Sequence, residues 1–328
     1  MVMETKNMAK NNYSLISSLQ LAKICGVSQG TIDRALNNRP DIKPATKEKI
    51  LEAAKKYGYI PNVASPHMSG TKSKLYGIVL FNLYNDYFSQ FIMDFEELCQ
   101  SIGYNSIIMF SHNDLQSEIG CINQLVHLGV DGIVLCSVGQ SDEYSRYLHS
   151  QNIPIITIGN KVKGLPFVGI NDFAAMKDLV NYELDAKPDA DFYYFAPVLE
   201  RAEEENIYCM LERYRAFTEA LESRNKPYCT VTDPNKITEL LKNSKSSVVI
   251  CATDHYAIQV SQMAYENKIE NVKTTGFDNC ELLKKLHSNI DSLGFDRKEL
   301  VNTIQKCLSE ESPNEFNYIA HNIVSYNK

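Results

Sequence analysis

Residues 21–62 read LAKICGVSQGTIDRALNNRPDIKPATKEKILEAAKKYGYIPN, and this stretch decides the fold of the N-terminal part of the chain. Its apolar residues recur at helical spacing in three short blocks that turn signals separate. Ser28 is a good N-cap for the second block, and Gly26 suits the left-handed position that ends the first. We therefore expect three short helices, with a tight turn at residues 25–27 between the first two.

This arrangement of two helices around a tight turn, with polar side chains opening the second, is typical of a recognition helix that enters the major groove of DNA. Gln29, at the start of the second helix, is a candidate for base readout, and Arg34 is a candidate for a guanine or phosphate contact. Thr31, Asn37 and Asn38 are candidates for contacts with the DNA backbone. The alternative for each residue is a solvated helix face, which the three-helix context disfavours.

The distribution of charge favours DNA binding by the N-terminus. The 328-residue chain has a net charge of -7, from 33 Lys+Arg and 40 Asp+Glu. Residues 1–74 hold 12 Lys+Arg and 5 Asp+Glu, which leaves 21 and 35 for the rest, so the head carries +7 and the body -14. A basic head on an acidic body suits a protein that contacts phosphate at one end only. A lysine-rich, solvated N-terminus is the alternative that charge alone leaves open.

Residues 21–62 resemble the headpiece of the LacI/GalR family of bacterial repressors. The resemblance runs through GVS (26–28), TIDRALN (31–37), TKEKI (46–50) and GYIPN (58–62). It implies that Gln29 and Gly30 occupy the two main base-reading positions and that Arg34 occupies a later one. Because Gly30 has no side chain, readout is expected to depend on Gln29 and Arg34. Asp33 stands where the family often has a serine near phosphate, and a carboxylate there opposes the charge of DNA.

Residues 60–73, IPNVASPHMSGTKS, have the composition of a linker. The resemblance implies a short helix that forms on DNA and wedges an apolar side chain into the minor groove, with Met68 at the wedge position and Asn62 also matching. A helix starting at Asn62 would hold Pro66 in its interior, at a cost of roughly 3 kcal/mol. We therefore expect a shorter helix that begins at Pro66, with Ser65 as its N-cap. The residues assigned to DNA contacts are Ser28, Gln29, Gly30, Thr31, Arg34, Asn37, Asn62 and Met68.

From Leu75 onwards, apolar runs alternate with amphipathic segments. This alternation predicts an α/β fold with parallel sheets covered on both faces and ligands at the carboxyl ends of the strands. The expected strands are LYGIVLF (75–81), NSIIMF (105–110), DGIVLC (131–136), PIITIG (154–159), DFYYFAP (191–197), SSVVICA (246–252) and VKTTGF (272–277). The length of the chain allows two such lobes.

The body also resembles the effector domain of the same family, which is similar to periplasmic sugar-binding proteins (type I). The landmarks are GYNSIIMFSHND, LVHLGVDGIVL, IPIITIGN, GIND, ERYRAFTEAL, CATDHYA and TTGFDN. The resemblance implies two Rossmann-like lobes joined by three crossovers, near residues 186, 291 and 316. The expected domains are a helix-turn-helix headpiece at 1–60, a hinge at 61–74 and an effector-binding and dimerisation domain at 75–328. Lobe one would span about 75–185 and 292–316, and lobe two about 186–291 and 317–328.

Clefts of this kind hold ligand hydroxyls with planar bidentate donors and carboxylates, and pack an aromatic ring on the apolar face of the ligand. The resemblance implies that Arg213 grips the effector and that Asp278 supplies a carboxylate. Thr253 and Asp254 match a strand-end pair that starts a helix. The other effector-binding candidates are Tyr87, Phe88, Asn113, Asp114, Ser137, Asn160, Asn171 and Asp172.

Alternatives remain at several of these positions. Arg213 could pair with Glu212 or Glu219 along a helix, Asp254 and Asp114 could be N-caps, and Tyr87 could be a core residue. The sequence also departs from the family after IPIIT, where the usual Asp-Arg is replaced in the run Ile158-Gly159-Asn160. Because a carboxylate and a guanidinium that could bind a ligand are lost there, an ordinary sugar effector does not follow from the resemblance.

Other classes of protein are disfavoured by what the sequence lacks. No apolar run is long enough for a membrane helix or a signal peptide, so we expect a cytoplasmic protein. Nine scattered cysteines show no zinc or redox spacing, and no dinucleotide, P-loop or GxSxG motif occurs. We therefore expect no enzyme activity, no metal and no cofactor.

The sequence predicts a homodimeric transcription regulator, a repressor, that binds a palindromic DNA operator and responds to a carbohydrate-like effector held between the lobes. The runner-up is a ligand-independent DNA-binding protein with a vestigial sensor domain. A solute-binding protein and an enzyme are further alternatives. The sequence leaves open whether the effector is an inducer or a corepressor.

Overall fold

The chain divides into two units, residues 1–73 and 74–328, which we call the headpiece and the body. The structure is a computed structural model. The residues that it describes are 18–36, 39, 41–57, 59, 72–201, 206–285, 290–310 and 313–326.

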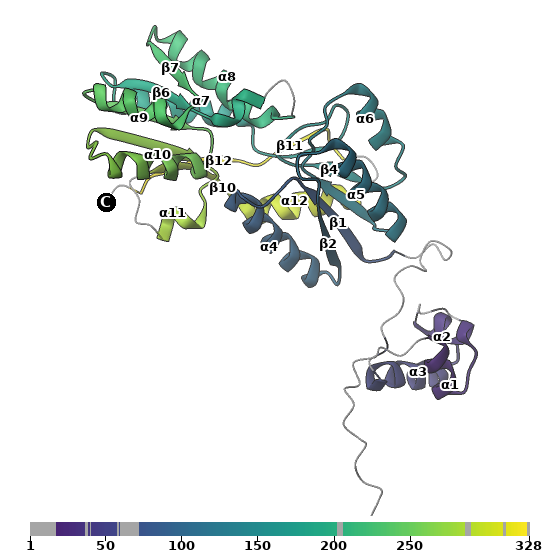
Figure 1. The fold of residues 1–328 in the computed structure, drawn as a ribbon. Helices are drawn as coiled ribbons and strands as arrows, with labels where there is room; N and C mark the ends of the chain where they lie inside the picture. The colour runs from purple at the N-terminus through teal and green to yellow at the C-terminus, as the bar shows by residue number, and fades with distance from the viewer. Residues whose placement is uncertain are drawn as a thin grey trace, which may run out of the picture. The chain divides into compact units, whose positions relative to one another are not determined.

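The described residues of the headpiece form three helices (Figure 1), which confirms the prediction from the sequence. They are α1 (Ser18–Cys25), α2 (Gln29–Leu36) and α3 (Pro44–Tyr57). Gly26 takes a positive φ of 68° at the end of α1, and the Ser28 hydroxyl accepts a hydrogen bond of 3.2 Å from the Thr31 amide, as expected of an N-cap. Leu21, Ile32 and Ile50 bring one buried side chain from each helix into a small core.

The sequence places four apolar residues of α3 at helical spacing, but two of them do not face this core. Ile50 and Ala54, one turn apart, are buried, but Leu51 and Tyr57 are 45% and 44% exposed. Since the two other helices of the headpiece are short, they cover only a narrow strip of α3.

Lobe one of the body is built on a six-stranded, wholly parallel sheet. Its strands, in spatial order, are β11 (Phe316–Tyr318), β5 (Phe167–Gly169), β4 (Ile155–Thr157), β3 (Gly132–Leu135), β1 (Leu75–Leu80) and β2 (Asn105–Phe110). One face packs on α4 (Asp86–Ser101) and α12 (Arg297–Ser309), and the other on α5 (Leu115–Leu128) and α6 (Asp142–His149). The sheet is therefore covered on both faces, which explains why its central strands are continuous apolar runs.

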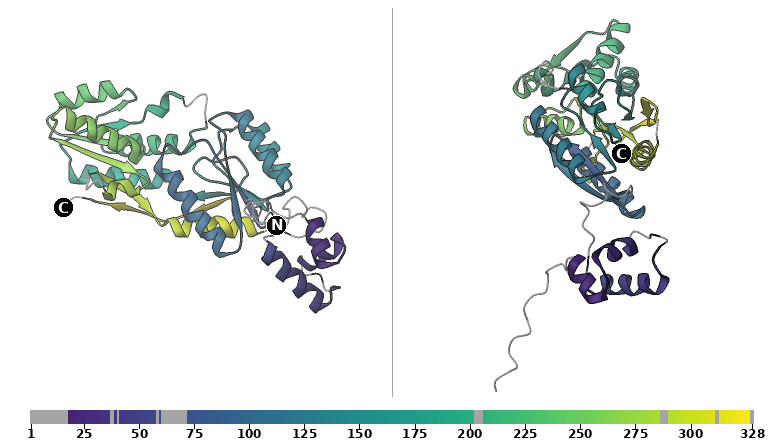
Figure 2. Two further views of the ribbon diagram at one scale, coloured as in Figure 1. Left: turned by 60° about the horizontal axis from the view of Figure 1, so that its bottom comes forward. Right: turned by 90° about the vertical axis from the view of Figure 1, so that its right-hand side faces the viewer.

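Lobe two repeats the arrangement (Figure 2), except that its edge strand β12 is antiparallel. Its strands, in spatial order, are β12 (His321–Val324), β10 (Asp291–Phe295), β9 (Val272–Phe277), β8 (Ser247–Cys251), β6 (Asp191–Phe195) and β7 (Tyr228–Val231). One face packs on α7 (Asp172–Ala186) and α8 (Tyr208–Ser223), and the other on α9 (Pro234–Asn243), α10 (Asp254–Glu266) and α11 (Glu281–Lys285). A short 3-10 helix, η2 (Pro197–Arg201), follows β6.

The two α/β lobes and all seven strands predicted from the sequence are present. Five further strands, β5, β7, β10, β11 and β12, were not predicted. All are three to five residues long, and β7, β11 and β12 are mostly not buried, so they lack a continuous apolar run.

The crossovers between lobes differ from those expected near residues 186, 291 and 316. Helix α7 packs on α8, β10 and β12, so the chain enters lobe two at residues 170–171. Strand β10 pairs with β9, and β11 pairs with β5, which places the other two crossovers at Asp296 and at residues 319–320. The amphipathic pattern of α7 predicts a helix but does not indicate which sheet it covers.

No helix in the described part of the chain combines the length and the apolar character needed to cross a membrane.

The largest apolar core runs through both lobes, from Phe95 on α4 to Phe217 on α8. Burial of these surfaces is the main stabilising contribution to the body.

A buried polar cluster lies in lobe two beneath α7. Lys273 on β9 forms a 2.8 Å ion pair with Asp291 on β10, and both side chains are almost fully buried. Glu183 on α7 is 1% exposed, and its buried Oε1 has no hydrogen-bond partner among the described residues. Burial raises the pKa of Glu183 to about 7, against the opposing effect of Lys273.

The substitution Glu183→Gln removes this titration. Because the pKa of Glu183 is higher in the folded state than its ordinary value of 4.5, the neutral form stabilises the fold, and that stability is lost as the pH rises through about 7. The wild-type body should therefore lose roughly 2 kcal/mol relative to E183Q between pH 5 and pH 8. Urea unfolding at both pH values measures the difference, and a constant difference would contradict it. The exposed Glu239→Gln on α9 is the control, with no such change expected.

Candidate functional site

Helix α2 presents a polar face to solvent. Gln29, Gly30, Asp33 and Arg34 are exposed, while Ile32 and Ala35 between them are buried in the headpiece core. Arg34 makes only a loose, exposed ion pair with Asp41 at 3.9 Å. The side chains predicted to read bases therefore lie where a helix in the major groove would carry them.

The remaining DNA-binding candidates lie either at the start of α2 or outside the described residues. Ser28 caps the start of α2, and its hydroxyl oxygen also lies 2.8 Å from that of Thr31 in the first turn. Asn37, Asn62 and Met68 lie outside the described residues, as do Asn38, Ser65 and Pro66. The DNA contacts of all eight candidates, Ser28, Gln29, Gly30, Thr31, Arg34, Asn37, Asn62 and Met68, remain predictions.

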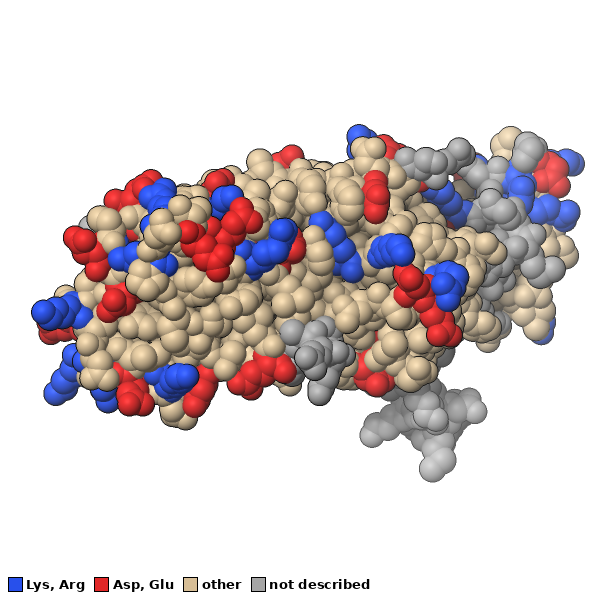
Figure 3. Space-filling model, turned by 90° about the horizontal axis from the view of Figure 1, so that it is seen from above, with Lys and Arg blue, Asp and Glu red and all other residues tan. Residues whose placement is uncertain are grey.

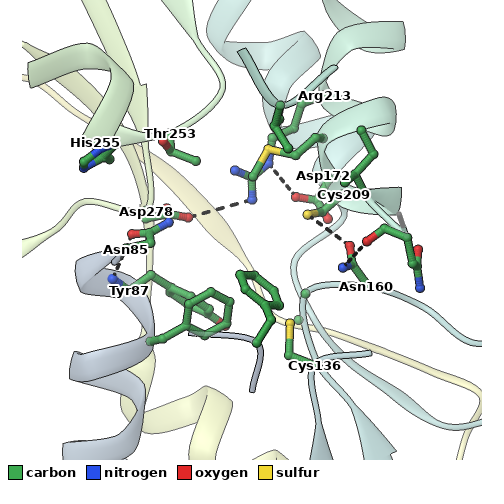
Figure 4. A pocket seen from close by; sticks show the side chains of 18 of the residues that line it. Asn85, Tyr87, Cys136, Asn160, Asp172, Cys209, Arg213, Thr253, His255 and Asp278 are labelled. Carbon is green, nitrogen blue, oxygen red and sulfur yellow. Dashed lines mark hydrogen bonds and ion pairs between the residues drawn. The ribbon is translucent and has the colours of Figure 1, made fainter. Parts of the chain in front are cut away.

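The body contains a cavity of about 280 Å³ between its two lobes. Residues that follow β1, β3 and β4 line it from lobe one, and residues that follow β6, β8 and β9 line it from lobe two (Figure 4). Parallel strands bring their carboxyl ends to one edge of a sheet, so both sheets direct their following loops toward the same space. Eight of the twelve predicted effector residues lie in the lining, namely Tyr87, Phe88, Asn113, Asn160, Asp172, Arg213, Thr253 and Asp278.

Arg213 on α8 is the central polar group of the cavity. Its Nε donates to Asp172 Oδ1 at 2.8 Å, its Nη1 donates to the carbonyl of Ala252 at 2.7 Å, and its Nη2 lies 3.8 Å from Asp278 Oδ1. The guanidinium also stacks on the ring of Phe277, with Cζ 3.4 Å from the ring centroid. The alternative pairing of Arg213 with Glu212 or Glu219 does not occur, because those carboxylates pair with Arg215 and Lys177.

The two carboxylates beside Arg213 are almost fully buried, and burial raises the pKa of both. The pKa of Asp278 rises to about 6, because Arg213 and a hydrogen bond from Asn85 offset only part of the effect of burial. Asp172, the first residue of α7, also has its pKa raised by burial, with Arg213 opposing the shift. The three side chains form a charged cluster that is bonded within the protein.

Asp278 also connects the lobes. The side-chain amide of Asn85, the N-cap of α4 in lobe one, donates to Asp278 Oδ2 at 3.1 Å. Asp278 has a positive φ of 105°, an unusual conformation for an aspartate, and its amide donates to Leu293. Asp278 therefore bonds to lobe one with one oxygen while the other faces Arg213 in lobe two.

A second connection between the lobes lies on the side of the cavity away from Asn85 (Figure 4). Asn160 in lobe one donates to the carbonyls of Ser137 and Asn206, and Asn206 in turn donates to the carbonyls of Gly139 and Lys161. Asn160 and Asn206 are 5% and 4% exposed. The family usually has Asp-Arg at positions 159–160. Here the position of the arginine is taken by Asn160, which together with Asn206 forms hydrogen bonds between the two lobes.

Four predicted effector residues do not line the cavity, and Asp254 is one of them. Its Oδ2 accepts from the Cys280 amide at 2.7 Å and its Oδ1 accepts from Ser292 at 2.6 Å. Thr253, rather than Asp254, is the N-cap of α10. Burial and the nearby Asp278 raise the pKa of Asp254 to about 7. Asp254 therefore connects the loop that follows β9 to the start of β10.

Asp114, Asn171 and Ser137 are also structural. Asp114 and Asn171 are the N-caps of α5 and α7, accepting from the Ser117 and Ala174 amides. Ser137 is fully buried and donates to Glu118, whose carboxylate also accepts from Tyr144. Caps and ligand-binding residues use the same residue types at strand ends, so the sequence did not separate them.

The sequence did not predict several lining residues. They include Asn82, Tyr84, Asn85, Cys136, Asn206, Cys209, Met210 and His255. Residues 82–85 follow the first strand directly, and this position is the signal that could have revealed them. Residues 206–210 are brought to the cavity by tertiary packing at the start of α8, for which the sequence holds no local signal.

The surface of the body offers no single charged patch on the face in Figure 3, where Lys and Arg side chains alternate with Asp and Glu. Within the described residues, no cluster of three or more His, Cys, Asp or Glu could hold a metal ion. The cavity chemistry therefore depends on the Arg213 cluster and on the apolar lining.

Arg213 should be essential for the stability of lobe two. Arg213→Ala leaves two buried carboxylates without a counterion, which should lower the free energy of unfolding by about 3–5 kcal/mol. The matched control is Arg215→Ala on the same helix, where an exposed pair with Glu212 is lost at a cost of about 0.5 kcal/mol. Urea unfolding of both variants measures the difference, and equal losses would refute the role of the cluster.

Two family models match the chain. The model described as bacterial regulatory proteins, lacI family, matches residues 20–62, and the model described as periplasmic binding proteins and sugar binding domain of LacI family matches residues 73–185. The curated relatives include catabolite control protein A of Staphylococcus xylosus. It is 22% identical over 324 residues, which cover 95% of this chain and 98% of that protein.

Solved structures share the fold. The lac repressor dimer bound to operator and the anti-inducer ONPF has a TM-score of 0.78 at 15% identity, covering 95% of this chain and 98% of that chain. The complex of the transcriptional regulator CelR with cellobiose has a TM-score of 0.63 at 15% identity, covering 94% and 98%. The chain is therefore a DNA-binding transcriptional regulator whose headpiece matches the lacI family model and whose body is similar to the periplasmic-binding-protein-like domain of that family.

Proposed function

We propose that this regulator is a cytoplasmic repressor that binds a palindromic operator as a homodimer and responds to a small molecule in the cavity between its lobes. The hinge at residues 61–74 would couple the body to the headpiece. The operator-bound lac repressor dimer supports the palindrome and the dimer by analogy. The sugar-binding description of the second family model supports a carbohydrate or related metabolite as effector.

One observation carries the proposal that a ligand in the cavity controls the protein. Asp278 lines the cavity, faces Arg213 in lobe two and accepts a hydrogen bond from Asn85 in lobe one. A ligand that bonds to Asn85 or to Asp278 therefore competes directly with the hydrogen bond between the two lobes. Because the differential affinity of a ligand for two lobe arrangements shifts their populations, occupancy of this cavity would change the body that carries the headpieces.

The competing proposal is a DNA-binding protein that ignores ligands. It would share the headpiece but show no response of operator affinity to any metabolite. Selection of bound sequences from random duplex DNA by the full-length protein, with and without metabolite extract, separates the two. An enriched palindrome whose recovery changes with extract supports the regulator, and recovery that extract leaves unchanged supports its rival.

The same selection tests the reading helix. Gln29→Ala should broaden the preference at one position of each half-site and leave most salt-dependent affinity intact, because Gln29 is exposed at the start of α2. The matched variant Asp33→Ser, on the same exposed face, removes a carboxylate and should strengthen binding to all sequences alike. A uniform loss of affinity in Gln29→Ala with an unchanged motif would remove Gln29 from base readout.

The connection between the lobes has its own test. Asn85→Asp keeps the oxygen that accepts from the Tyr87 amide and caps α4, but replaces the donor to Asp278 with a repelling carboxylate. We expect this variant to shift operator affinity by tenfold or more in the absence of ligand, as measured by fluorescence anisotropy. Asn267→Asp also replaces a side-chain donor with a carboxylate, at the exposed end of α10 and outside the cavity lining, and should leave affinity within twofold. Equal behaviour of the two variants would disprove the coupling.

A further inference from the structure

Most of the surface that lines the cavity is apolar. Aromatic side chains contribute a large part of it, and Tyr87 packs edge-on against both Phe88 and Phe295, with ring centroids 5.0 and 6.1 Å away. In Figure 4, Tyr87 and Cys136 lie on the side of the cavity opposite Arg213 and Asp172. A ligand therefore meets a polar cluster on one side and an apolar wall on the other.

Three of the five asparagine side chains in the lining use both of their polar atoms within the protein. Asn85 uses its oxygen on the Tyr87 amide and its nitrogen on Asp278. Asn160 and Asn206 bond to main-chain carbonyls of the protein, and the oxygen of Asn160 accepts from the Cys209 thiol at 3.5 Å. A polyol carries hydroxyl groups around its whole edge, and each one that is buried without a partner weakens binding. Because these three amides have no polar atom left for a ligand, the lining favours a ligand with one polar end over a ring of hydroxyls.

The charge of the lining disfavours anions. Among the described lining residues, Asp172, Arg213 and Asp278 are the acidic and strongly basic side chains, so the ionised cluster carries one positive and two negative charges. Arg213 already faces both carboxylates and a carbonyl. A phosphate that approached Arg213 would meet those carboxylates in an enclosed space, where repulsion is weakly screened.

We infer that the effector is a small, uncharged or singly cationic molecule with a hydrophobic ring and one polar end, and that phosphorylated sugars and other anions are excluded. This inference rests on the proposed function, because it concerns the ligand of the same cavity, but it replaces the carbohydrate that the family description supports with another class of small molecule. The polar end bonds to the cluster of Asp172, Arg213 and Asp278, and the ring packs on the wall that includes Tyr87. The volume of about 280 Å³ lies at the lower limit of small-molecule sites, which suits a ligand of one or two rings.

A series of probes that share one ring and differ in charge tests the inference. Benzamidine, benzamide, benzoate and phenyl phosphate are titrated against the full-length protein by saturation-transfer NMR, with D-glucose as the polyol. Benzamide and benzamidine should bind, while benzoate, phenyl phosphate and glucose should bind at least tenfold more weakly. Equal or tighter binding of either anion or of glucose overturns the inference, and so does a failure of both benzamide and benzamidine to bind.

Three substitutions connect the result to the cavity. Asp278→Asn keeps the shape of the side chain and removes one negative charge, so the affinity for benzoate relative to that for benzamide should rise at least fivefold. Asp172→Asn makes the same change at the other carboxylate and serves if the first variant does not fold. Val198→Trp fills the cavity and should abolish binding of every probe. Probe affinities that none of these variants alters would overturn the inference.

Fractionation of a metabolite extract separates this inference from the proposed function. The extract is passed over an anion-exchange column, and each fraction is tested for its effect on operator affinity. Activity in the unbound fraction supports the inference, and activity in the bound fraction overturns it. Activity in no fraction counts against effector control itself, and the probe titrations then decide the ligand class alone.

Discussion

The ion-pair cluster of Arg213, Asp172 and Asp278 joins the start of α7, the middle of α8 and the end of β9 at the edge of the cavity. Buried charges are tolerated only when they are paired and hydrogen-bonded, and here the guanidinium is held by two carboxylates, a carbonyl and an aromatic ring. The position of α8 over its sheet, the shape of the cavity and the connection to lobe one all depend on this cluster. Stability and ligand response are thus combined in the same side chains.

The parallel sheets explain why the cluster is placed there. In each lobe the strand order reverses next to the first strand, β1 or β6, and the loops that follow these strands and their neighbours line the cavity. Contacts between the lobes are made by loops of this kind, through Asn85 on one side and through Asn160 and Asn206 on the other. The fold therefore supplies the cavity, and a few amide side chains set how firmly it closes.

Much of this organisation is encoded locally and could be predicted. The apolar periodicity of residues 18–57 and the long apolar runs of the body are local signals, and Arg213 and Asp278 follow motifs that the resemblance aligns. Other features are set by tertiary packing. Asn85 and Asp278 are 193 residues apart in the chain, and α7 has the same pattern whichever sheet it covers. Asp254 and Ser137 have the chemistry of ligand-binding residues but bond only within the protein.

The three passages of the chain between the lobes restrict their relative motion. With connections at residues 170–171, 296 and 319–320, one lobe cannot slide past the other without straining all three. The movement that remains is a rotation of one lobe relative to the other about the line of these connections. A ligand in the cavity therefore acts on the rest of the protein by changing the angle between the lobes. Chemically different ligands would differ only in which value of that angle they favour.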